Sequence, residues 1–213
     1  MGFLSLPSIF FKKKKNKTKI TKRGKSASNL TDEPSTGGQT ECDAGALVLT
    51  KEEDVPPNAS PELRVVREWI RCKDQQDVDK MKELTADDCF FTFVDSETEM
   101  PAREFFGAMQ DIYASFPDLH FFWESMSIKG QDKDGSVLVA IQDYYGIGKH
   151  TGAPYFFGPY PPVPTSNKTV RDENIEFTFT VKNGKITNAT IDAFGMVVGP
   201  PGFYTKIGGV VFW

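Results

Sequence analysis

Residues 182–185, with the sequence Lys-Asn-Gly-Lys, constrain the fold more than any other part of this 213-residue chain. An Asn-Gly pair between two runs of alternating residues favours a two-residue type I′ turn, because both turn positions require a positive φ. The flanking runs, 170–181 and 186–194, are therefore expected to form an antiparallel hairpin.

A regular ladder from this turn predicts which side chains share a face of the sheet, because directly opposed residues lie on the same side. The opposed pairs are Val181 with Ile186, Phe179 with Asn188, Phe177 with Thr190, and Ile175 with Asp192. Aromatic and aliphatic residues dominate this set. We therefore expect it, together with Phe194, to form the inner face.

Asp192 is the candidate catalytic residue on that face. A carboxylate held against apolar walls resists ionisation, so its pKa rises towards the range that suits a general acid or base. The alternative is that Asp192 lies at the strand end, where solvent or a backbone N–H stabilises its charge.

Helical segments are expected before the hairpin. Ser60 and Pro61 are a good N-cap and first helical residue, and apolar residues then recur at three- and four-residue steps. Further helices are expected over 77–84 and 101–116, and strands over 89–94, 119–128 and 136–147. Helices followed by a mostly antiparallel sheet predict an α+β fold, in which a curved sheet around the N-terminal helices encloses a cavity.

Several motifs occur in a characteristic order after residue 115. They are Phe-Pro-Asp-Leu-His-Phe at 116–121, Gly-Ile-Gly at 146–148, His-Thr-Gly at 150–152, Pro-Thr at 164–165, and Asn-Gly-Lys-Ile at 183–186. Over residues 60–208 the chain resembles the SnoaL-like polyketide cyclases, within the superfamily that resembles nuclear transport factor 2. The resemblance implies a cone-shaped α+β fold, a hydrophobic pocket and, often, a homodimer across the sheet.

The resemblance also implies a cofactor-independent cyclase, isomerase or lyase in which Asp192 transfers protons on a small, apolar, oxygenated substrate. The residues expected around the ligand are Tyr144, Phe177, Phe179, Thr190, Phe194 and His150. Cyclases of this group also use a pocket histidine, and the strand over 170–181 has none. The alternative is a non-catalytic ligand-binding or dimeric scaffold module.

Metal binding is not expected. His120 and His150 are the only histidines, and neither has neighbours at metal-ligand spacing. The three cysteines are widely separated and form no Cys-x-x-Cys motif, which favours reduced thiols and a cytoplasmic location. The aromatic and proline-rich insertion 153–163 is expected to be a lid, a docking surface for a partner, or a stiff loop over the open end of the cone.

The first 58 residues differ in composition from the rest. Residues 1–30 contain nine lysines and arginines and no acidic residue, whereas the whole chain has a net charge of −4. This basic stretch is followed by a Ser-, Gly- and Pro-rich segment, so residues 1–58 are expected to be a disordered extension of a domain over 59–213. An apolar island at 46–49 could dock on that domain.

Three roles remain open for the basic stretch. Residues 1–25 could bind an anionic membrane surface, act as a nuclear-import or nucleic-acid-binding patch, or form a solvated tail. The charges follow the apolar residues, unlike those of a secretory signal, and Leu6 occupies the position where N-myristoylation of Gly2 requires Ser or Thr. The acidic remainder is not expected to bind nucleic acid.

Overall fold

The computed structural model describes residues 48–49, 56, 58–193, 195 and 197–211. The basic stretch and most of the predicted extension therefore lie outside the described residues, as does Phe194. Residues 48 and 49 were expected in the disordered extension, but they form a short strand, β1 (Val48–Leu49), that pairs with β5 (Ser125–Gln131). The second half of the apolar island, Val48 and Leu49, thus contributes to the sheet.

The described elements confirm the predicted α+β order. The helices are α1 (Pro61–Asp74), α2 (Val78–Glu83), α3 (Ala102–Ser115) and α4 (Gly199–Ile207). The remaining strands are β2 (Thr85–Phe93), β3 (Thr98–Pro101), β4 (His120–Phe122), β6 (Val137–Lys149), β7 (Thr169–Arg171), β8 (Ile175–Lys182) and β9 (Lys185–Asp192). The helix α4 was not predicted.

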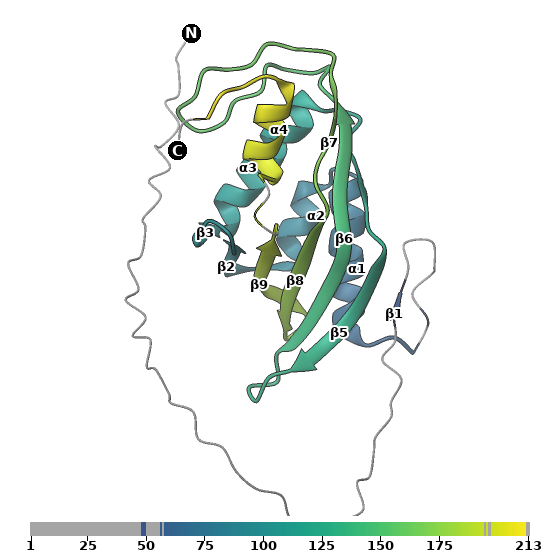
Figure 1. The fold of residues 1–213 in the computed structure, drawn as a ribbon. Helices are drawn as coiled ribbons and strands as arrows, with labels where there is room; N and C mark the ends of the chain where they lie inside the picture. Colours follow the sequence, from purple (N-terminus) through teal and green to yellow (C-terminus); the bar gives the residue numbers. More distant parts are fainter. Residues whose placement is uncertain (1–47, 50–55, 57, 194, 196, 212–213) are drawn as a thin grey trace, which may run out of the picture.

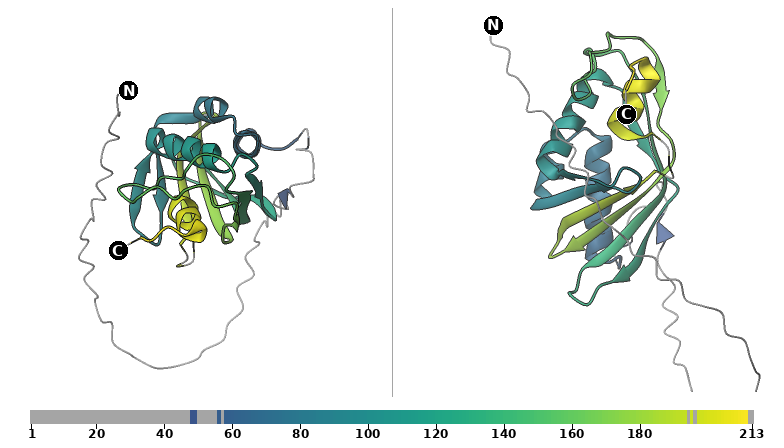
Figure 2. Two further views of the ribbon diagram at one scale, coloured as in Figure 1. Left: turned by 90° about the horizontal axis from the view of Figure 1, so that it is seen from above. Right: turned by 60° about the vertical axis from the view of Figure 1, so that its left-hand side comes forward.

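A nine-stranded sheet curves around α1, α2 and α3, as Figures 1 and 2 show. Its strand order is β1-β5-β6-β8-β9-β2-β3, with β4 and β7 also paired to β6. All neighbouring pairs are antiparallel except β2 with β9. The concave face packs on the helices, and α4 lies over the upper end of β8 and β9 in Figure 1.

Local sequence explains how α1 begins and which face it buries. The Ser60 hydroxyl accepts a hydrogen bond from the Leu63 amide at 3.2 Å, as expected for an N-cap. Leu63, Val66, Trp69 and Ile70 are buried against the sheet. Burial of these four apolar side chains holds α1 across the concave face.

The predicted turn is present, but the ladder beyond it is irregular. Asn183 and Gly184 have φ values of 51° and 74°, and Val181 pairs with Ile186 as expected. Thr180 then pairs with Asn188, so Thr187 is an extra residue in β9. Such a bulge moves every later residue of the strand to the opposite face.

The predicted register is therefore wrong beyond the bulge. Phe179 pairs with Ala189 and Phe177 with Ile191, so these residues share the buried face. Asp192 pairs with Glu176, and Thr190 pairs with Thr178, on the opposite, half-buried face. The apolar residues of β8 were placed correctly, whereas the polar residues of β9 were not.

Candidate functional site

The helices and the concave face of the sheet enclose a cavity of about 50 Å³. Its walls are mostly apolar and come from α1, α3, β6, β8 and α4. That volume holds only a few water molecules, since one requires roughly 10–15 Å³. Four ionisable side chains contribute to this apolar lining, namely Lys73, Tyr144, Tyr145 and Asp172, and of these Lys73, Tyr144 and Asp172 are buried.

Lys73 lies in the last turn of α1, on the buried face that also carries Trp69 and Ile70, and it is 6% exposed. Its Nζ atom lies 4.3 Å from the ring centre of Phe121 and 4.7 Å from that of Tyr144. The rings of Phe177, Trp69 and Phe105 complete the surroundings at 5.4–5.9 Å. The amine is therefore enclosed by five aromatic rings.

Within the described part of the chain, the Lys73 amine has no ion-pair partner within 4 Å and no hydrogen bond. Burial lowers the pKa of Lys73 to about 7, and the negative charge of Asp172 opposes this shift without cancelling it. A lysine with this pKa is partly a neutral amine at physiological pH. The Tyr113 hydroxyl, from α3, donates a 2.8 Å hydrogen bond to the Lys73 carbonyl and holds this end of α1 in place.

Asp172 lies between β7 and β8 and is 8% exposed. Its carboxylate accepts hydrogen bonds from the amides of Gly199 at 2.9 Å and Glu173 at 3.1 Å. Burial raises the pKa of Asp172 to about 6, although these amides, Lys206 and Lys73 favour the ionised form. Asp172 therefore lines the cavity and also binds the first residue of α4.

Tyr144 points inward because β6 also contains a bulge. Ile141 pairs with Phe177 and Tyr144 with Ile175, so β6 has one more residue than β8 between these pairs. Asp143, at the bulge, has a φ of 52°. The buried positions consequently change from 137, 139 and 141 to 144, 146 and 148.

The Tyr144 hydroxyl is buried and has no hydrogen-bond partner among the described residues. Burial raises its pKa well above the ordinary value of 10. Asn188 Oδ1 is also buried without a hydrogen-bond partner among the described residues, but it does not line the cavity. A hydroxyl left unpaired costs stability, so its position beside the cavity suits a ligand that would accept its hydrogen bond.

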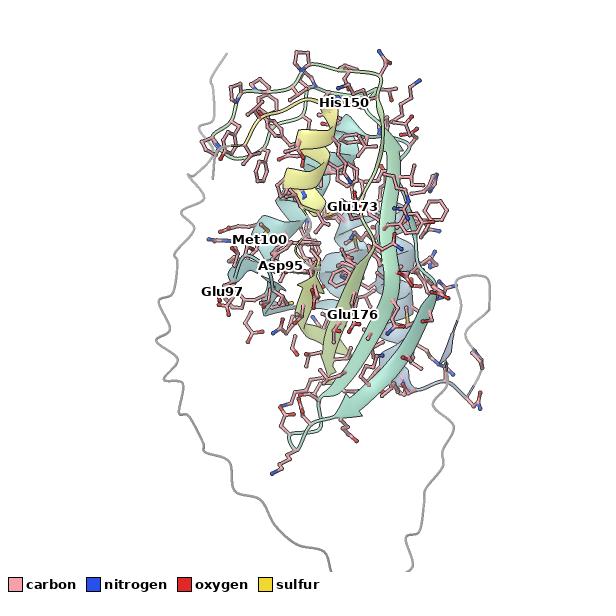
Figure 3. The ribbon with its side chains drawn as sticks, in the orientation of Figure 1. Asp95, Glu97, Met100, His150, Glu173 and Glu176 are labelled. Atoms are coloured by element: carbon pink, nitrogen blue, oxygen red, sulfur yellow. The ribbon has the colours of Figure 1, made fainter. Side chains whose placement is uncertain are left out.

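The helix α4 forms one wall of the cavity and is attached by polar contacts to its surroundings. Lys206 pairs with Glu173 at 2.8 Å, and Figure 3 shows Glu173 beside the helix. The Tyr204 hydroxyl donates to the Pro161 carbonyl at 2.6 Å, and Tyr155 donates to that of Pro200 at 3.3 Å. The insertion 153–163 thus supports α4 and does not itself line the cavity.

A second carboxylate holds the chain just before α4. Asp95, labelled in Figure 3, accepts hydrogen bonds from the amides of Ala193 and Gly195, both at 3.0 Å. Asp95 is exposed and does not line the cavity. It is therefore a natural control for Asp172, since both carboxylates bind two backbone amides near α4.

The predicted ligand residues fall into three groups. Tyr144 and Phe177 line the cavity, as expected. Phe179 is in the core, packed on Trp69 and Phe177, while Thr190 and Asp192 lie on the opposite face of β9. Asp192 does not lie on the inner face or line the cavity, so the argument for its catalytic role no longer applies.

His150 is fully buried and has a structural environment. Its Nδ1 lies 3.1 Å from the Ser166 hydroxyl and its Nε2 lies 3.1 Å from the Ala153 carbonyl. The imidazole stacks on Phe116 at 5.1 Å. These contacts fasten the insertion to the cone, and His150 does not line the cavity.

Sequence reasoning missed Lys73 and Asp172. A signal existed for Lys73, because it follows Trp69 by four residues and Ile70 by three, on the helix face predicted to be buried. Asp172 falls within the predicted strand 170–181, but it precedes the alternation that begins at Ile175, and nothing in the pattern distinguishes it from the adjacent Glu173. Among the described residues, no group of three or more potential metal ligands occurs, and no helix is long and apolar enough to cross a membrane.

No family model and no curated protein matches the sequence. Solved structures do match. AclR from Streptomyces galilaeus, provisionally described as a hydroxylase, has a TM-score of 0.51 and 15% identity, over 70% of this chain and 83% of its own. IdmH from Streptomyces antibioticus, provisionally described as a polyketide cyclase, has a TM-score of 0.50 and 17% identity, over 70% of this chain and 99% of its own.

A third solved structure is a provisional SnoaL-like polyketide cyclase from Jannaschia sp. CCS1. It has a TM-score of 0.47 and 18% identity, and covers 65% of this chain and 89% of its own. AclR and IdmH show that the chain has the cone-like fold that the sequence motifs predicted.

Proposed function

We propose that this chain is an enzyme that transfers protons on small, apolar carbonyl compounds, in a reaction of the cyclase or isomerase type. The observation that carries the proposal is the convergence of Lys73, Tyr144 and Asp172 on one apolar cavity, where the Lys73 amine and the Tyr144 hydroxyl have no partner among the described residues. Perturbed ionisable groups gathered in a cavity are typical of catalytic sites.

Each of the three groups has a distinct role in this proposal. The Asp172 carboxylate removes a proton from the carbon next to the carbonyl group, and later returns it. The Lys73 ammonium and the Tyr144 hydroxyl donate hydrogen bonds to the enolate oxygen that forms. Donors in a water-poor cavity stabilise such a charge more strongly than donors in water.

The cavity volume of about 50 Å³ sets how a substrate can enter. A compound of more than a few heavy atoms requires α4 to move, because Val198, Pro200 and Phe203 form part of the wall. Three glycines with positive φ, Gly195, Gly199 and Gly208, lie at or beside the ends of α4. Such positions are suited to changes of backbone direction.

The proposal agrees with the provisional description of IdmH as a polyketide cyclase, which has the same fold. It differs from the sequence-based hypothesis in the identity of the acid–base residue, because Asp172 lines the cavity and Asp192 does not. A new carbon–carbon bond in a cyclase and a shifted double bond in an isomerase can both begin from the same enolate.

Hydrogen–deuterium exchange of a simple ketone tests the proposal. The full chain is incubated with cyclopentanone in D2O, and loss of the proton signal next to the carbonyl is followed by NMR. We expect exchange above the protein-free rate in the parent protein and in Asp95→Asn, and at least about tenfold slower exchange in Asp172→Asn. Equal rates in the parent and Asp172→Asn would remove the assigned base.

The basic stretch supports a separate proposal about location. Nine positive charges within residues 1–30, preceded by apolar residues, suit an anionic membrane surface. Co-sedimentation with phosphatidylserine vesicles should be strong for the full chain at low salt and weak for a chain lacking residues 1–30. Equal sedimentation of the two proteins would contradict membrane recruitment and leave nuclear import or a solvated tail.

A further inference from the structure

We infer that Lys73 forms a covalent imine with small aliphatic aldehydes and ketones that enter the cavity. This inference rests on the proposed function for the location of the carbonyl group, but it assigns Lys73 a bond-forming role instead of a hydrogen bond. The arguments are the isolation of the amine, the ionisable groups around it, and the chemistry of the walls.

The position of the amine leaves its lone pair available. Tyr113 binds the Lys73 carbonyl, so the backbone at the end of α1 is held while the side chain extends into the cavity lining. The Nζ atom has aromatic rings around it and, within the described residues, no carboxylate within 4 Å. A carbonyl carbon that enters the cavity therefore meets an amine that no ion pair occupies.

Two buried ionisable side chains from other elements share the cavity lining with Lys73. They are Asp172, from the β7–β8 connection, and Tyr144, from β6, while the half-buried Tyr145 also contributes to the lining. The neighbouring Asp74 binds the Phe121 amide at 2.7 Å and lies 3.5 Å from His120, so its carboxylate is engaged away from the cavity. Burial lowers the pKa of Lys73 to about 7, which provides neutral amine near physiological pH.

The reaction balances without an oxidant, a reductant or a cofactor. The neutral amine attacks the carbonyl carbon, a C–N bond forms, and one amine proton passes to the carbonyl oxygen to give a carbinolamine. Protonated Asp172 then donates its proton to the hydroxyl group. The C–O bond breaks and water leaves, and the nitrogen lone pair completes the C=N bond of an iminium ion beside the Asp172 carboxylate.

The walls favour this product and limit its size. An iminium cation is stabilised by aromatic faces in the same way as the lysine ammonium that it replaces. The cavity of about 50 Å³ and its apolar lining select short aliphatic chains. A neutral Tyr144 hydroxyl can donate to the carbonyl oxygen during the attack, since burial keeps its pKa well above 10.

Reductive trapping with propanal tests the inference. The full chain is treated at pH 7 with propanal and sodium cyanoborohydride, and the rate of propyl addition at each lysine is followed by peptide mass spectrometry. The exposed Lys133 serves as the internal reference. We expect propylation at Lys73 at least about tenfold faster than at Lys133, because an ordinary lysine is almost wholly protonated at this pH.

Two variants complete the experiment. Lys73→Met should lose the fast adduct, and Lys133→Met should keep it. Modification of Lys73 no faster than that of Lys133 overturns the inference. Ketone exchange that depends on Asp172 would then still support the proposed function, with Lys73 acting as a hydrogen-bond donor. Fast trapping without ketone exchange would instead support the imine and refute the proton-transfer role.

Discussion

Replacement of Lys73 by methionine should make this protein more stable, and by an amount that depends on pH. The pKa of Lys73 falls from 10.5 to about 7 on folding, which corresponds to a ceiling of about 5 kcal/mol for the cost of burying the charge. The nearest rings, those of Phe121 and Tyr144, return about 1–2 kcal/mol of cation–π stabilisation. A net gain of at most about 3–4 kcal/mol is therefore expected for Lys73→Met at pH 6.

The sign of the pH dependence follows from the direction of the shift. A lysine whose pKa is lowered by folding binds more protons in the unfolded chain, so the parent protein gains stability as pH rises from about 7 to 10.5. Methionine does not titrate. The advantage of Lys73→Met should therefore be greatest below pH 7, shrink above it and vanish near pH 10.5.

Urea unfolding at pH 6, 8 and 10 measures these differences in the free energy of unfolding. The control is Lys133→Met, which removes an exposed lysine and should leave stability within about 0.5 kcal/mol of the parent at each pH. If Lys73→Met were less stable than the parent at pH 6, or if its advantage did not change with pH, the assignment of a buried, unpaired amine would be wrong.

Three further predictions concern the Tyr144 hydroxyl and the Asp172 carboxylate. Tyr144→Phe should be stabilised by about 1 kcal/mol, because it removes an unpaired buried hydroxyl, whereas Tyr113→Phe should lose about 1 kcal/mol with its bond to Lys73; urea unfolding of both variants checks this contrast. The rate of ketone exchange should rise through pH 6 as Asp172 ionises and fall through pH 7 as Lys73 deprotonates; a rate that keeps rising to pH 9 would contradict the ammonium role. The Gly199 amide should lose protection from hydrogen exchange below pH 6, where protonated Asp172 accepts its bond less strongly; protection factors from NMR that are the same at pH 5 and pH 7 would refute this link.

The sequence predicted those features of the fold that depend on local chemistry. Ser60 and Pro61 begin α1, and the Asn-Gly pair forms the turn between β8 and β9. These features need only a few adjacent residues with strong conformational preferences. The α+β order also followed from the change from helical to strand periodicity.

The register could not be predicted because bulges are not visible in the hydrophobic pattern. One extra residue at Thr187 sends Asp192 to the opposite face of β9, and one at Gln142–Asp143 brings Tyr144 inside. A carboxylate was therefore assigned to the cavity from the wrong strand. The acid that does line it, Asp172, directly follows β7 and is held by the amide of Gly199, which is 27 residues further along the chain.

Lys73 shows why charge alone is a poor guide to position in a helix. Its spacing from Trp69 and Ile70 places it on the buried face, but a charged residue there is normally assumed to reach solvent. The chain instead encloses the amine with aromatic rings from α1, α3, β4, β6 and β8. Helical spacing correctly indicates that Lys73 is buried, whereas its charge suggests an exposed position.

Lys73 and Tyr144, whose polar atoms have no partner among the described residues, also bear on why the cavity carries polar groups. An unpaired amine and an unpaired hydroxyl each reduce stability, and apolar residues of similar shape would remove both costs. A packing role for Lys73 alone could be filled by methionine, and one for Tyr144 by phenylalanine. Since both costs occur at one cavity, beside a carboxylate that also holds the first residue of α4, a ligand that pairs with these groups is the economical explanation for their presence. The same reasoning distinguishes Tyr144 from Tyr113, whose hydroxyl is already paired within the protein.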